Sequence, residues 1–165
     1  MIYRRSAQLA LQASLLLALE PAGAPRRVSE IADELGVPRT YLAKVLQGLT
    51  RIGLLHAVRG PGGGVCLARS PREIHLWDVL SAIEPVGEFE QCFLGLGQCN
   101  EAQPCPLHEA WGPIRTNILA MLQTKSLWEF ATEAQEKHAL DRCPPSGQTL
   151  KVHPSKPDSH QGAPR

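Results

Sequence analysis

The sequence lacks any apolar run long enough to cross a membrane. A spanning helix needs about twenty consecutive apolar residues. The leucine-rich stretch near the N-terminus is interrupted by Gln8, Gln12 and Ser14 and is closed by Glu20. We therefore expect no membrane contact and a cytoplasmic chain. With 165 residues, of which 43% are hydrophobic, the chain can bury one ordinary core but not two independent ones.

The same stretch imitates a secretory signal, because Arg4 and Arg5 precede it and Ala22-Gly23-Ala24 follows it. However, its apolar residues recur at helical spacing. The positions that share one face are Leu9, Ala13, Leu16 and Leu17. We therefore interpret the stretch as a helix of the fold and not as a leader.

Net charge is also nearly absent, at +1, but the charges are unevenly distributed. Residues 1–72 hold ten Lys and Arg against four Asp and Glu, a net +6, whereas residues 73–165 hold seven against twelve, a net −5. A basic first part suits a polyanion, and an acidic second part suits protein contacts, a cation or water.

Residues 28–54 predict two helices joined by a tight turn. Ser29 is a candidate N-cap of the first helix, and Gly36 ends it. In the second helix an apolar stripe is expected to face the core: Leu42, Val45, Leu46, Leu49 and Ile52. The opposite face presents Arg39, Thr40, Ala43, Lys44 and Gln47, and we expect Arg39, Thr40, Tyr41 and Lys44 to enter the major groove. A polar, net-positive face on the second helix of a helix-turn-helix fits the major groove of DNA, although Tyr41 fits the edge of the core equally well.

Residues 54–69 predict a β-hairpin around the run Gly60-Pro61-Gly62-Gly63-Gly64. A tip without side chains can approach a phosphate backbone and offer bare N–H groups. We expect Arg59, Gly62 and Gly63 at the minor groove or flanking phosphates, and Arg4 and Arg5 at the DNA backbone. A nucleotide-binding phosphate loop is disfavoured, because no Gly-Lys-Ser/Thr ending follows the glycines. The predicted fold class is mainly α with a small β wing, a winged helix-turn-helix.

Three later pairs of residues have the spacing of a capping box, which marks the start of a helix. Ser70 with Glu73 and His75 with Asp78 are alternative starts for a short helix, and Ser126 with Glu129 opens another. Between them, apolar residues alternate four and three apart: Leu107, Trp111, Ile114, Ile118 and Met121. This seam predicts a homodimer, whose symmetry would match a palindromic operator in double-stranded DNA. Because of Gly112-Pro113, the helix is expected to be kinked or to begin at Pro113.

The predicted organisation follows from these segments. Residues 1–84 form the DNA-binding winged helix, residues 85–108 a cysteine loop, residues 109–140 the dimerisation helices, and residues 141–165 a disordered polar tail. No nucleophile has an evident base beside it, so we expect no catalytic site and no enzyme.

The loop gathers three thiols and an imidazole: Cys92, Cys99, Cys105 and His108. Cysteines of a cytosolic chain favour metal or redox chemistry over disulfides, and these four groups are enough to hold one metal centre. Zinc and an iron-sulfur cluster both accept this donor set, so residue chemistry leaves the two open. Ordinary packing cysteines are the remaining alternative.

At this point the residues resemble a known family, the Rrf-type winged-helix transcription regulators, which include iron-sulfur regulators of the IscR and NsrR types. The match rests on Val28-Ser-Glu-Ile-Ala, Tyr41-Leu, the wing Val58-Arg-Gly-Pro-Gly-Gly-Gly with Leu67-Ala-Arg, and Cys105-Pro-Leu-His108-Glu-Ala-Trp111. The resemblance implies that Cys92, Cys99 and Cys105 bind an iron-sulfur cluster, that His108 is the fourth ligand, and that Arg59 reaches the minor groove.

The resemblance also bears on cluster type. Nitric oxide sensors of the family use a carboxylate near the N-terminus as a ligand, whereas Gln8 stands here. This departure favours a 2Fe-2S cluster, and a 4Fe-4S cluster is the alternative. Cys66 stands where the family usually has an aromatic residue, and we interpret it as a buried strand residue; Cys143 is given no role.

The function implied is a transcription regulator, a repressor or dual regulator, whose DNA affinity is set by the state of its cluster. Two alternatives stay open from the sequence: a cluster-free regulator controlled by a partner or metabolite, and an iron-sulfur electron-transfer or carrier protein. A zinc-stabilised RNA-binding protein is a third alternative.

Overall fold

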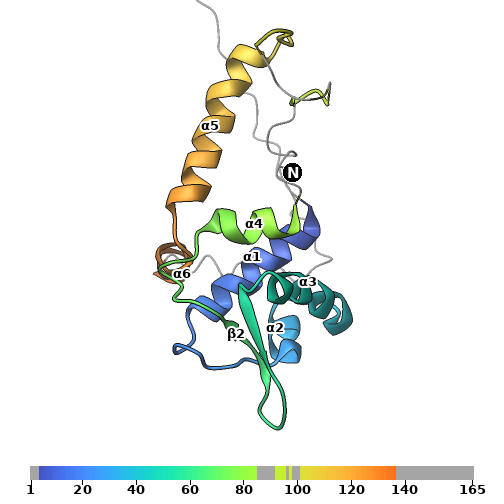
Figure 1. The fold of residues 1–165 in the computed structure, drawn as a ribbon, viewed down its shortest axis with the longest axis vertical. Helices are drawn as coiled ribbons and strands as arrows, with labels where there is room; N and C mark the ends of the chain where they lie inside the picture. Colours follow the sequence, from blue (N-terminus) through green and yellow to red (C-terminus); the bar gives the residue numbers. More distant parts are fainter. Residues whose placement is uncertain (1–3, 85–91, 96, 98–100, 137–165) are drawn as a thin grey trace, which may run out of the picture.

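The computed structural model describes residues 4–84, 92–95, 97 and 101–136. The elements are α1 (Arg5–Ala18), α2 (Val28–Glu34), α3 (Arg39–Arg51), β1 (Leu55–Val58), β2 (Gly64–Leu67), α4 (Leu76–Ile83), α5 (His108–Thr124) and α6 (Leu127–Glu136) (Figure 1). A helix-turn-helix followed by an antiparallel hairpin is a winged helix, so the predicted fold class is confirmed. Among the described helices, none has the length and apolar character of a membrane span.

Helix α1 lies at the centre of the fold. Nine of its fourteen residues are buried, because α3, α4, α6 and β2 all pack against it. The predicted face is among them: Leu9, Ala13, Leu16 and Leu17. A helix covered on most sides can be apolar on most sides. This burial explains why the sequence of α1 imitates a secretory signal.

The start of α1 is held by a carboxylate from the end of α4. Glu84 Oε1 accepts a hydrogen bond of 2.7 Å from the backbone N–H of Arg4, and Glu84 Oε2 lies 3.5 Å from Arg4 Nε. The Glu84 side chain is only 1% exposed. Because a buried carboxylate is costly unless it is paired, this contact fixes the two helix ends together.

The helix-turn-helix follows the predicted pattern with two corrections. Helix α2 begins at Val28, so the prediction of Ser29 as N-cap is wrong; the Glu30 carboxylate instead accepts the backbone N–H of Arg27 at 3.3 Å. Gly36 ends α2 with a φ of 61°. The stripe Leu42, Val45, Leu46 and Leu49 is buried. Ile52 is 54% exposed because α3 ends at Arg51, so its assignment to the core is wrong.

Strand β2 of the wing has backbone hydrogen-bond partners on both of its edges. Its register runs from Leu55 opposite Leu67 to Val58 opposite Gly64. On the other edge, Val65 and Arg26 exchange two backbone hydrogen bonds of 2.9 Å. A Cβ atom at Gly64 would lie 2.2 Å from the carbonyl oxygen of Arg26. This glycine is therefore required by the packing of the hairpin itself.

Capping boxes mark two of the later helices. Helix α4 uses the second of its two candidate starts, since the His75 N–H donates to Asp78 Oδ2 at 2.9 Å. Helix α6 follows the predicted box, in which the Glu129 N–H donates to Ser126 Oγ at 3.2 Å and the Ser126 N–H donates to Glu129 Oε2 at 3.0 Å. Helix α5 begins at His108 and includes Pro113, so it does not begin at the proline.

The C-terminal end of α5 is tied to the winged-helix body. The Leu76 N–H donates to the carbonyl of Lys125 at 3.1 Å, the Leu127 N–H donates to Ile74 at 2.8 Å, and Leu122 is buried. From this attachment α5 extends away from the body, and its N-terminal end lies at the opposite end of the molecule from the tip of the wing (Figure 1).

We expect Gly64→Ala to lower the free energy of unfolding by about 3 kcal/mol, the upper end for overpacking, because the added Cβ meets backbone atoms that cannot rotate away. Gly62→Ala is the matched control. Gly62 has a φ of 80° and open space around it, so the alanine should cost about 1 kcal/mol of backbone strain. Urea unfolding measures both variants, and equal losses would contradict the close contact at Gly64.

Hydrogen bonds from Ser126, first from its backbone N–H and then from its hydroxyl, lower the pKa of Glu129 from its ordinary value of 4.5. A carboxyl with a lowered pKa stabilises the fold above the unfolded-state pKa and loses that effect as pH falls through the folded-state pKa. Glu129→Gln should therefore melt at a temperature that changes less between about pH 5 and pH 3 than in the wild type. Glu136→Gln, at the exposed end of α6, is the control. If the melting temperature of Glu129→Gln fell between these pH values as much as that of the wild type, this role of the Glu129 cap would be refuted.

Candidate nucleic-acid interface and metal-ligand loop

The outward face of α3 is polar and basic. The side chains opposite its buried stripe are exposed: Arg39, Thr40, Tyr41, Ala43, Lys44, Gln47 and Arg51. The helix contains no acidic residue, so this face is cationic. Tyr41 is 39% exposed while the adjacent Leu42 is fully buried, which places Tyr41 on the outward face and not at the edge of the core. Such a face on the second helix of a helix-turn-helix can enter a major groove.

The tip of the wing has a charged side chain, that of Arg59, followed by a glycine-rich turn. Arg59 follows β1, is exposed, and has no ion pair within the described part of the chain. Gly60 and Gly62 have positive φ angles of 102° and 80°. The Gly63 N–H donates to Gly60 O at 2.9 Å, so it is used inside the turn and is not bare as expected. The tip therefore offers its charge through Arg59.

The two arginines at the start of α1 differ in their surroundings. Arg4 is engaged by the buried carboxylate of Glu84, whereas Arg5 is exposed and its guanidinium lies 3.4 Å from Gln8 Oε1. Arg4 therefore has a role in the fold whatever else it contacts. Nothing in the residue pattern around Glu84 predicts this pair, because its partner is 80 residues away along the chain.

Two of the three predicted cysteine ligands lie in the described residues. Cys92 is buried; its N–H donates to Gly97 O and its carbonyl accepts from the Gly95 N–H, both at 2.8 Å. Cys105 is half-buried, and its carbonyl accepts the His108 N–H at 2.9 Å, so Cys105 and His108 form the first turn leading into α5. Cys99 and Cys143 lie outside the described residues.

An aromatic contact brings the two ends of the loop together. The rings of Phe93 and Trp111 lie 5.3 Å apart between centroids, tilted by 54°. Phe93 is next to Cys92, and Trp111 follows His108 by three residues on α5. Residues three apart share one side of a helix. The contact therefore holds the Cys92 segment against the turn that carries His108. Neither aromatic was predicted to belong to the site.

The donor set suits a soft metal centre. Within the described residues no three candidate ligands form a group: Cys92, Cys105 and His108 all lie among them, but the structure does not bring the three together. Trp111 Nε1 is buried and has no hydrogen-bond partner in this part of the chain. An unpaired buried donor costs about 1–3 kcal/mol, so an acceptor is expected there. Thiolates, an imidazole and an indole N–H in need of an acceptor fit an iron-sulfur cluster, and the three ligands also fit zinc.

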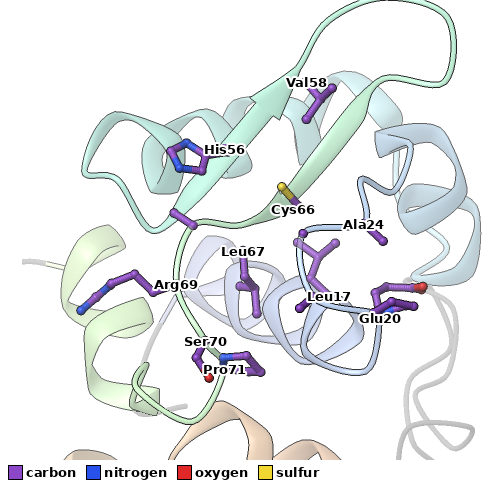
Figure 2. A pocket seen from close by; sticks show the side chains of 14 residues that line it. Leu17, Glu20, Ala24, His56, Val58, Cys66, Leu67, Arg69, Ser70 and Pro71 are labelled. Atoms are coloured by element: carbon purple, nitrogen blue, oxygen red, sulfur yellow. The ribbon is translucent and has the colours of Figure 1, made fainter.

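A second feature lies at the base of the wing. A cleft of about 580 Å³ separates the hairpin from the segment that follows α1, and Cys66 and His56 line it from paired positions on β2 and β1 (Figure 2). Cys66 is 6% exposed, so the prediction that it is a buried strand residue is confirmed. Arg69 lies along the same cleft, at the base of the hairpin and not at its tip (Figure 2).

Three of the five seam residues of α5 are exposed in the described part of the chain. Leu107, Ile114 and Met121 are 38%, 52% and 47% exposed, and Trp111 and Ile118 are half-buried. Helix α5 extends away from the winged-helix body, so among the described residues few lie beside its N-terminal half (Figure 1). An apolar stripe of this kind is typical of a helix that pairs with another.

Comparisons with known proteins agree with the fold. Residues 3–133 match the model of the Rrf2 family, described as an iron-dependent transcriptional regulator. An HTH-type transcriptional regulator of Aquifex aeolicus is 31% identical over 140 residues, which are 84% of this chain and 96% of that relative. The transcriptional regulator IscR of Aliivibrio salmonicida is 30% identical over 133 residues, which are 81% of this chain and 79% of that relative.

A solved structure shows the same fold. CymR, the global cysteine regulator of B. subtilis, has a TM-score of 0.66 at 22% identity, covering 79% of this chain and 95% of CymR. The family consists of DNA-binding transcription regulators and not of enzymes, which confirms the predictions of a DNA-binding regulator and of no enzyme. The chain therefore belongs to the Rrf2 family of winged-helix transcription regulators.

Proposed function

We propose that this regulator is a homodimer whose affinity for DNA is set by an iron-sulfur cluster on Cys92, Cys99, Cys105 and His108. The observation that carries the proposal is the Phe93–Trp111 contact, which holds the Cys92 segment against the first turn of α5. The family description as iron-dependent and the similarity to IscR support the same reading. A bound cluster would supply a centre that responds to oxidants, nitric oxide or iron supply.

The type of cluster follows from the fourth ligand. Gln8, on α1, has a neutral amide where a carboxylate ligand would be anionic. His108 is half-buried in the turn that also holds Cys105. We therefore propose a 2Fe-2S cluster with His108 as a ligand, and 4Fe-4S or zinc as the outcomes that metal analysis would distinguish.

The proposed DNA contacts come from three places. Arg39, Thr40, Tyr41 and Lys44 on α3 would enter the major groove, because they form its exposed cationic face. At the wing, Arg59 with Gly62 and Gly63 would reach the minor groove or its flanking phosphates. Arg4 and Arg5 would contact the DNA backbone. A homodimer would read a palindromic operator with half-sites about 34–36 Å apart.

Coupling between the two sites would pass through α5. The turn that leads into α5 carries Cys105 and His108, its apolar seam would pair with a second copy, and the carbonyl of Lys125 at its C-terminal end accepts a hydrogen bond from α4. When Cys105 and His108 change their bonding, the start of α5 would shift and alter the spacing of the two α3 helices. A coupling of about 1–3 kcal/mol changes DNA affinity by about 5- to 150-fold.

A cluster-free regulator is the second candidate. The cleft of about 580 Å³ beside Cys66 could hold a small metabolite, and the fold neighbour CymR is named a global cysteine regulator. In that case the loop cysteines would bind no iron, and a metabolite would change DNA affinity from the base of the wing.

Arg59→Ala should weaken operator binding and reduce the slope of log affinity against log salt by about one unit, because one phosphate or groove contact is lost. Fluorescence anisotropy with labelled operator DNA at several salt concentrations measures the slope. Arg69→Ala is the matched control, since it removes the same charge from the base of the wing. A slope that falls equally in both variants would show only a net-charge effect and would argue against the proposed contact.

Protein purified without oxygen should be coloured and should contain iron and acid-labile sulfide, because thiolates and an imidazole hold the cluster. Replacing Cys92, Cys99 and Cys105 together with serine should remove both the colour and the dependence of DNA binding on oxidant or nitric oxide. Cys66→Ser, which changes a buried wing thiol, should leave the iron content unchanged. Colourless protein with stoichiometric zinc would end the iron-sulfur proposal.

A further inference from the structure

Trp111 has an indole N–H without an acceptor among the residues that the structure describes. Its Nε1 is buried and has no hydrogen-bond partner in the described residues. Its backbone N–H, by contrast, donates to Leu107 O at 2.7 Å as an ordinary part of the helix. Since buried donors in native proteins are nearly always paired, an acceptor that is not among the described residues is expected at this nitrogen.

The position of Trp111 indicates what that acceptor is. Trp111 lies three residues after His108, on the same side of α5, and its ring packs against Phe93, the neighbour of Cys92. The indole is thus held between the segments that carry the proposed ligands at both ends of the loop.

We propose that Trp111 donates a hydrogen bond from its indole N–H to a sulfur atom of the bound cluster and thereby raises the reduction potential of the cluster. The proposal rests on the proposed function. Sulfur in a cluster or in its thiolate ligands carries negative charge that increases on reduction, and N–H donors to sulfur stabilise the reduced form. Trp111 is therefore a positioning residue that tunes the centre and is not a ligand.

Trp111→Phe isolates the indole N–H, because phenylalanine keeps an aromatic ring for Phe93 to pack against. The variant should bind the same amount of iron and sulfide per protomer as the wild type, and its midpoint potential should be more negative in an anaerobic redox titration followed by absorbance. Trp128→Phe is the matched control. It removes an indole at a distant position, where the Trp128 ring lies 4.8 Å from the Arg72 guanidinium carbon, and it should leave the potential unchanged.

A second measurement uses the unaltered protein. In resonance Raman spectra of the wild type, Fe–S stretching bands should shift after exchange into D2O, and this shift should be smaller in Trp111→Phe. The wild-type experiment keeps the inference testable if the variant loses its iron. An iron-loaded Trp111→Phe with the wild-type potential, or wild-type bands that do not respond to D2O, would overturn the role of Trp111 alone. Wild-type protein that binds no iron would overturn the proposed function, and this inference with it.

Discussion

The burial of α1 on nearly all sides is the constraint on which the rest of the structure depends. Alanines at positions 7, 10 and 13 are fully buried and let neighbouring elements approach closely, while Leu9 fills the core between them. Helices α3, α4 and α6 and strand β2 all pack on this one helix. Helix α3, the base of the wing and the attachment of α5 therefore share a single core, and they are positioned relative to one another by it.

Contacts at both ends of the cysteine loop and α5 connect them to this core. Just before the loop begins, Glu84 joins the end of α4 to the start of α1. The backbone hydrogen bonds of Lys125 and Leu127 hold the C-terminal end of α5 on the same body. From that body α5 extends outward, with Cys105 and His108 at its N-terminal end and with Leu107, Ile114 and Met121 of its apolar seam exposed. A small change at that end would be carried along a stiff helix to the body, which is the arrangement that the proposed coupling requires.

Much of the fold was predictable because it depends on local periodicity and capping. The stripe of α3, the glycine at the end of α2, the hairpin and the Ser126 box of α6 were predicted as the structure has them. Ser29 and Ile52 were predicted wrongly, since each depends on where a helix begins or ends by one residue. The wing glycines were predicted as sites of approach to DNA; the structure adds that Gly64 has no room for a side chain because Arg26 crosses it.

By itself the sequence determined the winged helix, the cationic face of α3 and the set of candidate metal ligands, because these follow from residue spacing and charge along one segment. Only the tertiary structure decided that Glu84 holds the start of α1, that Phe93 meets Trp111, and that the indole nitrogen of Trp111 has no acceptor among the described residues. Each of these involves residues far apart in the chain or the burial of a single atom. Such contacts are set by how the helices pack around α1, and no local pattern in the sequence encodes them.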